Sequence, residues 1–139
     1  MSCAWTHFPH EGDVGVQGFG ADPAEAFANA ARAMTAVLVP LDQITANEAV
    51  EITCEAPELE VLLVDWLNAV IYEMATRSMV FGDFRVVIDS NCLRATALGE
   101  PVEVVRHAPS VELKGATFTQ LRVAQEADGR WLAQCVVDV

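Results

Sequence analysis

Two segments of this chain carry apolar residues at the three- and four-residue spacing of an amphipathic α-helix. The clearer one follows Ala56-Pro57-Glu58 and keeps this spacing over four turns. Its apolar positions are Leu59, Leu62, Leu63, Trp66, Leu67, Val70, Ile71 and Met74. We expect the other helix to begin after Asp22, a good N-cap, and to end before Pro40. The alanine-rich face of this second helix predicts close packing on a sheet. The longer apolar stripe, on the helix after Glu58, predicts that this helix lies in the hydrophobic core.

Alternating apolar and polar positions predict strands at residues 13–20, 49–54, 84–88, 93–98, 121–125 and 131–139. Ser90-Asn91 and Asp128-Gly129 predict hairpin turns. Residues 99–116 break the pattern, and such a long connection usually carries function or disorder. These elements predict an α+β fold, in which two main helices pack on a mixed or antiparallel β-sheet.

Glycines stand at positions 12, 15, 18 and 20, in and just before the first predicted strand. Glycine weakens a strand unless another part of the backbone comes close, so we expect close approach or local bends there. The spacing differs from the phosphate-binding pattern G-x-G-x-x-G, and we expect no apolar strand to precede it. A phosphate-binding loop is therefore not predicted.

Length and composition predict a single domain spanning residues 1–139. Apolar residues make up 53% of the chain, but no apolar run approaches the ~18 residues that span a membrane, and no leader pattern opens the chain. We therefore expect a soluble, cytoplasmic protein. The four cysteines, at positions 3, 54, 92 and 135, lack metal-ligand spacing, so we expect free thiols, mostly buried, and no zinc.

The formal net charge is −12, from 20 acidic and 8 basic residues. A protein that binds nucleic acid tightly through its phosphates needs a basic patch, so strong direct binding of RNA or DNA is not expected. The acidity favours solubility, or steering toward a basic partner or a cation. Lys114 is the one lysine in the sequence.

Two acidic residues stand at the ends of different predicted strands. Asp13 begins the first strand, and Asp138 lies next to Val139 at the end of the last one. Side by side, these groups would form a cation site; alternatively, Asp13 caps a strand entrance and Asp138 is solvated. On the long helix, Asp65 lies beside Trp66 and Asn68, where it either orients a loop, belongs to a site or faces solvent.

Several motifs, in this order, resemble the archease family over nearly the whole chain. They are His10-x-x-Asp13-Val14-Gly15-Val16, an Ala- and Phe-rich helix, Leu63-Val64-Asp65-Trp66-Leu67-Asn68, Ala95-Thr96-Ala97-x-Gly99-Glu100-Pro101, Arg106-His107, Glu112-x-Lys114-x-x-Thr117 and the Asp138-Val139 ending. The resemblance implies the strand-helix-strand-strand archease fold, which agrees with the order of elements read from the pattern.

The resemblance implies an activator protein rather than an enzyme. The expected partner is the RNA ligase that joins 2′,3′-cyclic phosphate or 3′-phosphate ends to 5′-hydroxyl ends in tRNA splicing and RNA repair. The activator promotes the ligase's guanylylation and turnover. The resemblance also implies a metal site at Asp13, Asp138 and the carboxylate of Val139, and oxygen ligands suit calcium or magnesium.

The resemblance suggests further roles for His10 and Lys114. His10 either orients the metal ligands, acts on the chemistry of the partner, or is a packed, hydrogen-bonded histidine. Lys114 either contacts a phosphate or carboxylate of the ligase or is a surface lysine. Asp65 and His107 are further candidates for contact with the site or the partner.

The chain departs from the archease pattern at three places. Glu11-Gly12 replaces Thr-Ala in the His-Thr-Ala-Asp-Ile motif, Pro9 stands where an acid is common, and Thr119 stands where the family has histidine. These departures favour a bacterial branch of the family.

Two alternatives remain at this point. One is a metal-dependent hydrolase acting on RNA or phosphoesters; its candidate residues are Asp13, Asp138, Glu100, His10 and His107. The sequence offers no paired metal-ligand motif and no nucleophile flanked by a base for it. The other is a protein interaction module that binds no metal.

Overall fold

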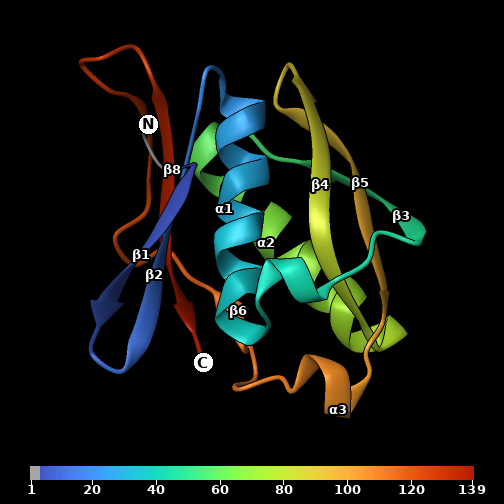
Figure 1. Cartoon of the computed structure of the whole chain (residues 1–139). Coiled ribbons are helices and arrows are strands. Elements are labelled where there is room, and N and C mark those ends of the chain that lie inside the picture. Colours follow the sequence, from blue (N-terminus) through green and yellow to red (C-terminus); the bar gives the residue numbers. More distant parts are fainter. Residues whose placement is uncertain (1–3) are drawn as a thin grey trace.

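The computed structural model describes residues 4–139, and its strands form two antiparallel sheets (Figure 1). The first sheet contains β1 (Trp5–His10), β2 (Asp13–Gly20), β8 (Trp131–Asp138) and β6 (Gly115–Ala116) in this order, and β7 (Arg122–Gln125) also pairs with β8. The second sheet contains β3 (Glu48–Glu55), β5 (Cys92–Pro101) and β4 (Met79–Asp89) in this order. The predicted α+β class is confirmed, with two sheets in place of one.

Two long helices, α1 (Pro23–Leu38) and α2 (Leu59–Arg77), fill the space between the two sheets (Figure 1). Two short helices, η1 (Leu41–Gln43) and α3 (Val104–His107), lie in connections. Both long helices begin and end close to the predicted residues. The order of layers is therefore sheet, helices, sheet.

Helix α1 is buried because it contacts a sheet on each side. Asp22 caps its first turn by accepting a hydrogen bond from the Glu25 N–H at 2.8 Å. One side of the helix contacts β2 and β8, and another contacts β4. At Gly18 of β2, a Cβ atom would lie 2.2 Å from the Ala26 carbonyl oxygen. The predicted close approach is confirmed, and the small alanine side chains make it possible.

The predicted apolar stripe of α2 forms the centre of the core. Leu62, Leu63, Trp66, Leu67 and Val70 are fully buried. The indole N–H of Trp66 donates to the Phe27 carbonyl oxygen at 3.0 Å, so the largest core side chain is also hydrogen-bonded to α1. This arrangement fixes the two helices relative to each other.

The expectation that no apolar strand precedes β2 is wrong. β1 pairs with β2 through a two-residue turn in which Glu11 and Gly12 have φ angles of 48° and 90°, as a tight hairpin requires. Phe8 lies opposite Gly15, and its ring occupies the space that a side chain at position 15 would need. The hairpin is therefore packed by an aromatic ring over glycine, which simple alternation does not reveal.

The connection expected between residues 99 and 116 is partly regular. β5 continues to Pro101, and α3 and β6 follow. The C-terminal hairpin and the hairpin of β4 and β5 are confirmed.

The cysteines are less uniformly buried than expected. Cys135 is buried, and burial raises the pKa of its thiol to about 12. Cys54 is half-buried, whereas Cys92 is exposed because it lies at the start of β5 on the open face of the second sheet, beside Glu55. Cys3 lies outside the described residues. None of the described helices is long and apolar enough to cross a membrane.

Candidate functional site

The ends of four strands of the first sheet bring the predicted site residues into one row. His10 of β1 lies opposite Asp13 of β2, and Asp138 of β8 lies opposite Gly115 of β6. The pairing of Val14 with Val137 places the preceding residue, Asp13, opposite Asp138. Residues opposite each other in antiparallel strands project from the same face. His10, Asp13 and Asp138 therefore share one face of the sheet.

The chain around Val139 closes this row from the other end of the sequence. The Val139 N–H donates to Asp13 Oδ1 at 3.1 Å, across 126 positions of sequence. The Lys114 N–H donates to the Asp138 carbonyl oxygen at 2.9 Å. We call Asp13, Asp138 and Val139 the carboxylate site; all three residues are half-buried.

The carboxylate site has the composition of a site for a hard cation. Like charges directly opposite each other on a sheet destabilise it, so Asp13 and Asp138 repel each other unless a cation lies between them. In residues 4–139, no three His, Cys, Asp or Glu side chains are arranged to hold a metal ion by themselves. A cation here would need both aspartates, the Val139 carboxylate and water, an oxygen-only set that suits calcium or magnesium.

Lys114 is next to the carboxylate site but leaves the sheet on the other face. The pairing of Gly115 with Asp138 places Lys114 opposite Val139, and neighbouring residues of a strand point to opposite faces. The side chain is exposed. Lys114 is thus exposed at the same end of the sheet as the carboxylate site.

A side chain that the sequence pattern left unassigned positions this strand. Asn68 of α2 donates through Nδ2 to the Ala116 carbonyl at 3.2 Å, and its Oδ1 accepts from the Ala116 N–H at 2.9 Å. The amide thus pairs with β6 as another strand would. Asp65, one turn earlier on α2, is exposed. Burial raises the pKa of the Cys54 thiol, and the negative charge of Asp65 raises it further, so Asp65 lies near Cys54 of β3 in the second sheet.

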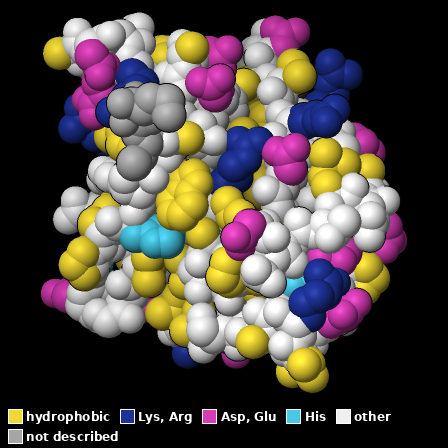
Figure 2. All heavy atoms as spheres, viewed as in Figure 1, with side chains coloured by type: hydrophobic (Ala, Val, Ile, Leu, Met, Phe, Trp, Pro, Cys, Tyr) yellow, Lys and Arg dark blue, Asp and Glu magenta, His cyan; other side chains and the backbone are white. Residues whose placement is uncertain are grey.

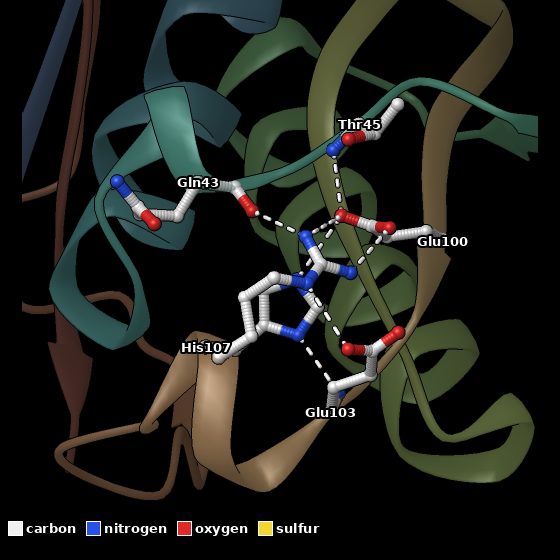
Figure 3. A network of polar contacts seen from close by, with 6 residues as sticks. Gln43, Thr45, Glu100, Glu103 and His107 are labelled. Atoms are coloured by element: carbon white, nitrogen blue, oxygen red, sulfur yellow. Dashed lines mark hydrogen bonds and ion pairs between the residues drawn. The ribbon is translucent and has the colours of Figure 1, made fainter.

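His107 and Glu100 belong to a separate polar network (Figure 3). Buried Glu100 accepts hydrogen bonds from both terminal nitrogens of Arg106, at 2.9 and 2.7 Å, and from the Thr45 N–H at 2.6 Å. His107 Nδ1 accepts from the Glu103 N–H at 2.8 Å, so Nε2 carries the proton and donates to Glu100 at 3.1 Å. The Arg106 bonds, foremost among these contacts, lower the pKa of Glu100 to about 2.

The network has a structural role. His107 is 2% exposed and both of its ring nitrogens are bonded within the network, which does not favour the predicted contact of His107 with a partner. The described bonds of Glu100 and His107 hold α3 against residues 43–45, and none reaches the carboxylate site. Sequence reasoning missed the network because a glutamate next to Pro101 is typical of an exposed turn.

Thr119, where the archease pattern has histidine, lies beside β8. Its carbonyl oxygen accepts from the Val136 N–H at 3.0 Å, and its own N–H donates to Thr117 Oγ1 at 3.2 Å. The side chain is exposed. The substitution therefore changes the surface near the carboxylate site and leaves the backbone pairing intact.

The two sheets, the enclosed helices and the carboxylate site define a small α+β fold. The model of the Archease protein family (MTH1598/TM1083) matches residues 5–139. The chain belongs to the archease family.

Two relatives illustrate the similarity over the full length. Protein archease of Pyrococcus furiosus is 34% identical over 139 residues, which cover 97% of this chain and 98% of that protein. Protein archease of Methanosarcina barkeri is 36% identical over 140 residues, covering 97% and 95%. Both relatives are archaeal, so they lend no support to the expected bacterial branch.

Two solved structures share the fold. Protein 1598 of Methanobacterium thermoautotrophicum has a TM-score of 0.80 at 32% identity, covering 98% of this chain and 99% of that one. An archease from Thermotoga maritima, described as a possible chaperone, has a TM-score of 0.63 at 18% identity, covering 95% and 94%. The first supports both family and fold, and the second supports the fold.

Proposed function

We propose that this protein activates the RNA ligase that joins 2′,3′-cyclic phosphate or 3′-phosphate ends to 5′-hydroxyl ends, as in tRNA splicing and RNA repair. In this role it promotes guanylylation of the ligase and its return to the active state after each ligation. Membership of the archease family supports the proposal. The observation that carries it is the carboxylate site, where Val139 is hydrogen-bonded to Asp13.

Asp13, Asp138 and the carboxylate of Val139 would hold a calcium or magnesium ion, which supplies a fixed positive charge at the end of the first sheet. The Val139 N–H occupies one lone pair of Asp13 Oδ1 and fixes the orientation of this carboxylate, while Oδ2 stays available. The bond from Lys114 to the Asp138 carbonyl holds the last strand in place. These two hydrogen bonds hold Asp13 and the last strand in position at the proposed site.

The charge of the protein favours the ligase over the RNA as the direct partner. A net charge of −12 attracts a basic protein surface and repels phosphates. Exposed Lys114 at the end of the sheet offers one local positive charge for a phosphate or carboxylate of the ligase. The proposed location is the cytoplasm.

Multiple-turnover ligation tests the proposal. The wild-type protein should raise the number of ligation events per ligase molecule, whereas Asp13→Ala and Asp138→Ala should lose most of this effect. Asp89→Asn is the control, because this aspartate is exposed on the second sheet. Residues appended after Val139 should also impair activation by displacing its carboxylate. Absence of stimulation by the wild type, or full stimulation by both alanine variants, would refute the proposal.

The two alternatives make different predictions. Glu100 and His107, which a hydrolase would need, are bonded to each other, and Glu100 is also bonded to Arg106, so the structure does not favour that reading. Cleavage of RNA by the purified protein alone would restore it. A metal-free interaction module would stimulate the ligase equally well with both aspartates replaced.

A further inference from the structure

A second surface feature lies at the end of the molecule toward which the C-terminus points. Helix α3 projects there (Figure 1), and hydrophobic side chains protrude over it (Figure 2). Val104 is 75% exposed and Val105 is 96% exposed. Neither valine is used by the core or by the carboxylate site.

The two valines are held in a defined position. The next two residues, Arg106 and His107, are bonded to buried Glu100, and the Arg106 guanidinium also donates to the Gln43 carbonyl at 3.1 Å. The backbone of α3 is therefore anchored on two sides. An apolar group that is already ordered loses little conformational freedom when it binds a partner.

An apolar pocket of about 210 Å³ opens beside α3, between the ends of the two long helices. Its lining includes Leu38, Ile71, Met74, Met79 and Leu113, and the exposed residue Glu112 also lines it. Ser110 fixes one wall, since its N–H and hydroxyl donate to the Leu38 and Val37 carbonyls. Val102 fixes another by donating to the Ser78 carbonyl at 2.9 Å.

The pocket has the chemistry to receive a side chain with an apolar stem and a cationic head. Lysine and arginine bury their methylene groups along apolar walls while the charged end stays polar. Met74 and Met79 adapt readily to the shape of such a stem. Glu112 is exposed at the pocket, Glu103 is exposed at the start of α3, and Lys114 is exposed next to Leu113. Glu100 and Glu103 together outweigh the charge of Arg106, so the sum of these charges is negative. The local charge therefore favours a basic partner.

We propose that α3 and this pocket form a docking surface for a basic segment of a partner protein. A lysine or arginine side chain of that segment enters the pocket and pairs with Glu112, while Val104 and Val105 contact apolar residues beside it. The identification of the partner as the RNA ligase rests on the proposed function. Docking here would bring the ligase to the same end of the molecule as the carboxylate site.

The pocket is tested without the ligase by titrating the protein with n-pentylamine, which has an apolar stem and a cationic head. Amide NMR signals of Ala75 and Leu113, which line the pocket, should shift with n-pentylamine and not with n-pentanoate. Glu112→Lys should reduce the shift caused by the amine at least fivefold. Equal shifts with both probes, or none with the amine, would overturn the assigned chemistry.

Binding to the purified ligase tests the docking surface as a whole. We expect a dissociation constant at least tenfold higher for the double variant Val104→Ser/Val105→Ser, and also for the variant Glu112→Lys. Stimulation of ligation should return at saturating concentrations. Val87→Ser is the matched control, because Val87 is 56% exposed on the second sheet and should bind as the wild type does.

The two proposals fail in different ways. Asp138→Asn should retain binding but lose stimulation, because it changes the carboxylate site and leaves α3 intact. Unchanged binding by the α3 and Glu112 variants, with stimulation by the wild type, would overturn the docking surface alone. If the wild type neither binds nor stimulates the ligase, the proposed function fails, and the amine titration still decides the chemistry of the pocket.

Discussion

The opposition of Asp13 and Asp138 predicts that one substitution has opposite effects on stability with and without a cation. Asp13→Asn keeps Oδ1 as the acceptor for the Val139 N–H and removes one of two like charges. Two like charges that face each other on neighbouring strands destabilise a sheet by about 0.2–1 kcal/mol. In a chelating buffer, the free energy of unfolding of the variant should therefore equal that of the wild type or exceed it by up to about this amount.

Calcium should reverse that order. A ligand that binds the folded state stabilises it by RT ln(1 + [L]/Kd), which is about 1.4 kcal/mol when calcium is at roughly ten times its Kd. The wild type should gain this free energy of unfolding, and Asp13→Asn should gain little of it. Urea unfolding near neutral pH, with EDTA and then with calcium or magnesium, measures both differences.

Asp89→Asn is the control for general charge effects, because Asp89 is exposed at the end of β4 on the other sheet. It should respond to calcium as the wild type does. Equal gains of stability by the wild type and Asp13→Asn, or no gain by either, would refute the reasoning for a cation between the two aspartates.

Three further predictions concern the fold. Gly18→Ala should lower the free energy of unfolding, measured in urea, by about 3 kcal/mol or more, because its Cβ would lie 2.2 Å from the α1 backbone. Gly115→Ala is the control: its Cβ would lie 3.5 Å from Asn68 Oδ1, so the free energy of unfolding should change by less than about 1 kcal/mol. Trp66→Phe should cost about 1–3 kcal/mol by the same measurement, since it removes the bond to Phe27. Folding lowers the pKa of Glu100 from 4.5 to about 2, so the stability that this carboxylate contributes is present above its unfolded pKa and is lost as the pH falls toward 2. A plot of the free energy of unfolding against pH should therefore be flatter below about pH 5 for Glu100→Gln than for the wild type. An unchanged plot would contradict the assignment of this pH dependence to Glu100.

The elements that the sequence predicts well are those whose signal is local. The stripe on α2, the Asp22 cap of α1 and the Asp128-Gly129 turn each need only neighbouring residues, and all three occur in the structure. β1 was missed because its packing depends on Phe8 lying over Gly15 of the next strand. Its turn also places Glu11 at a positive φ angle, where asparagine or glycine would be the usual signal.

The candidate site shows the same limit more sharply. Periodicity placed Asp13 and Asp138 at strand ends, but their proximity depends on β2 pairing with β8, which the sequence pattern alone does not determine. The family resemblance supplied that link. The burial of Glu100 could not be predicted locally either, because a charged residue is buried only where partners such as Arg106 and His107 satisfy it.

The most direct test of the cation site is anomalous diffraction from crystals grown with calcium. We expect an anomalous peak about 2.3–2.6 Å from carboxylate oxygens of Asp13, Asp138 and Val139, the distance typical of calcium ligands. The peak should vanish in Asp13→Asn crystals grown in the same way. Wild-type crystals with no peak there, grown at the calcium concentration used for urea unfolding, would contradict the claim that these three residues hold the cation.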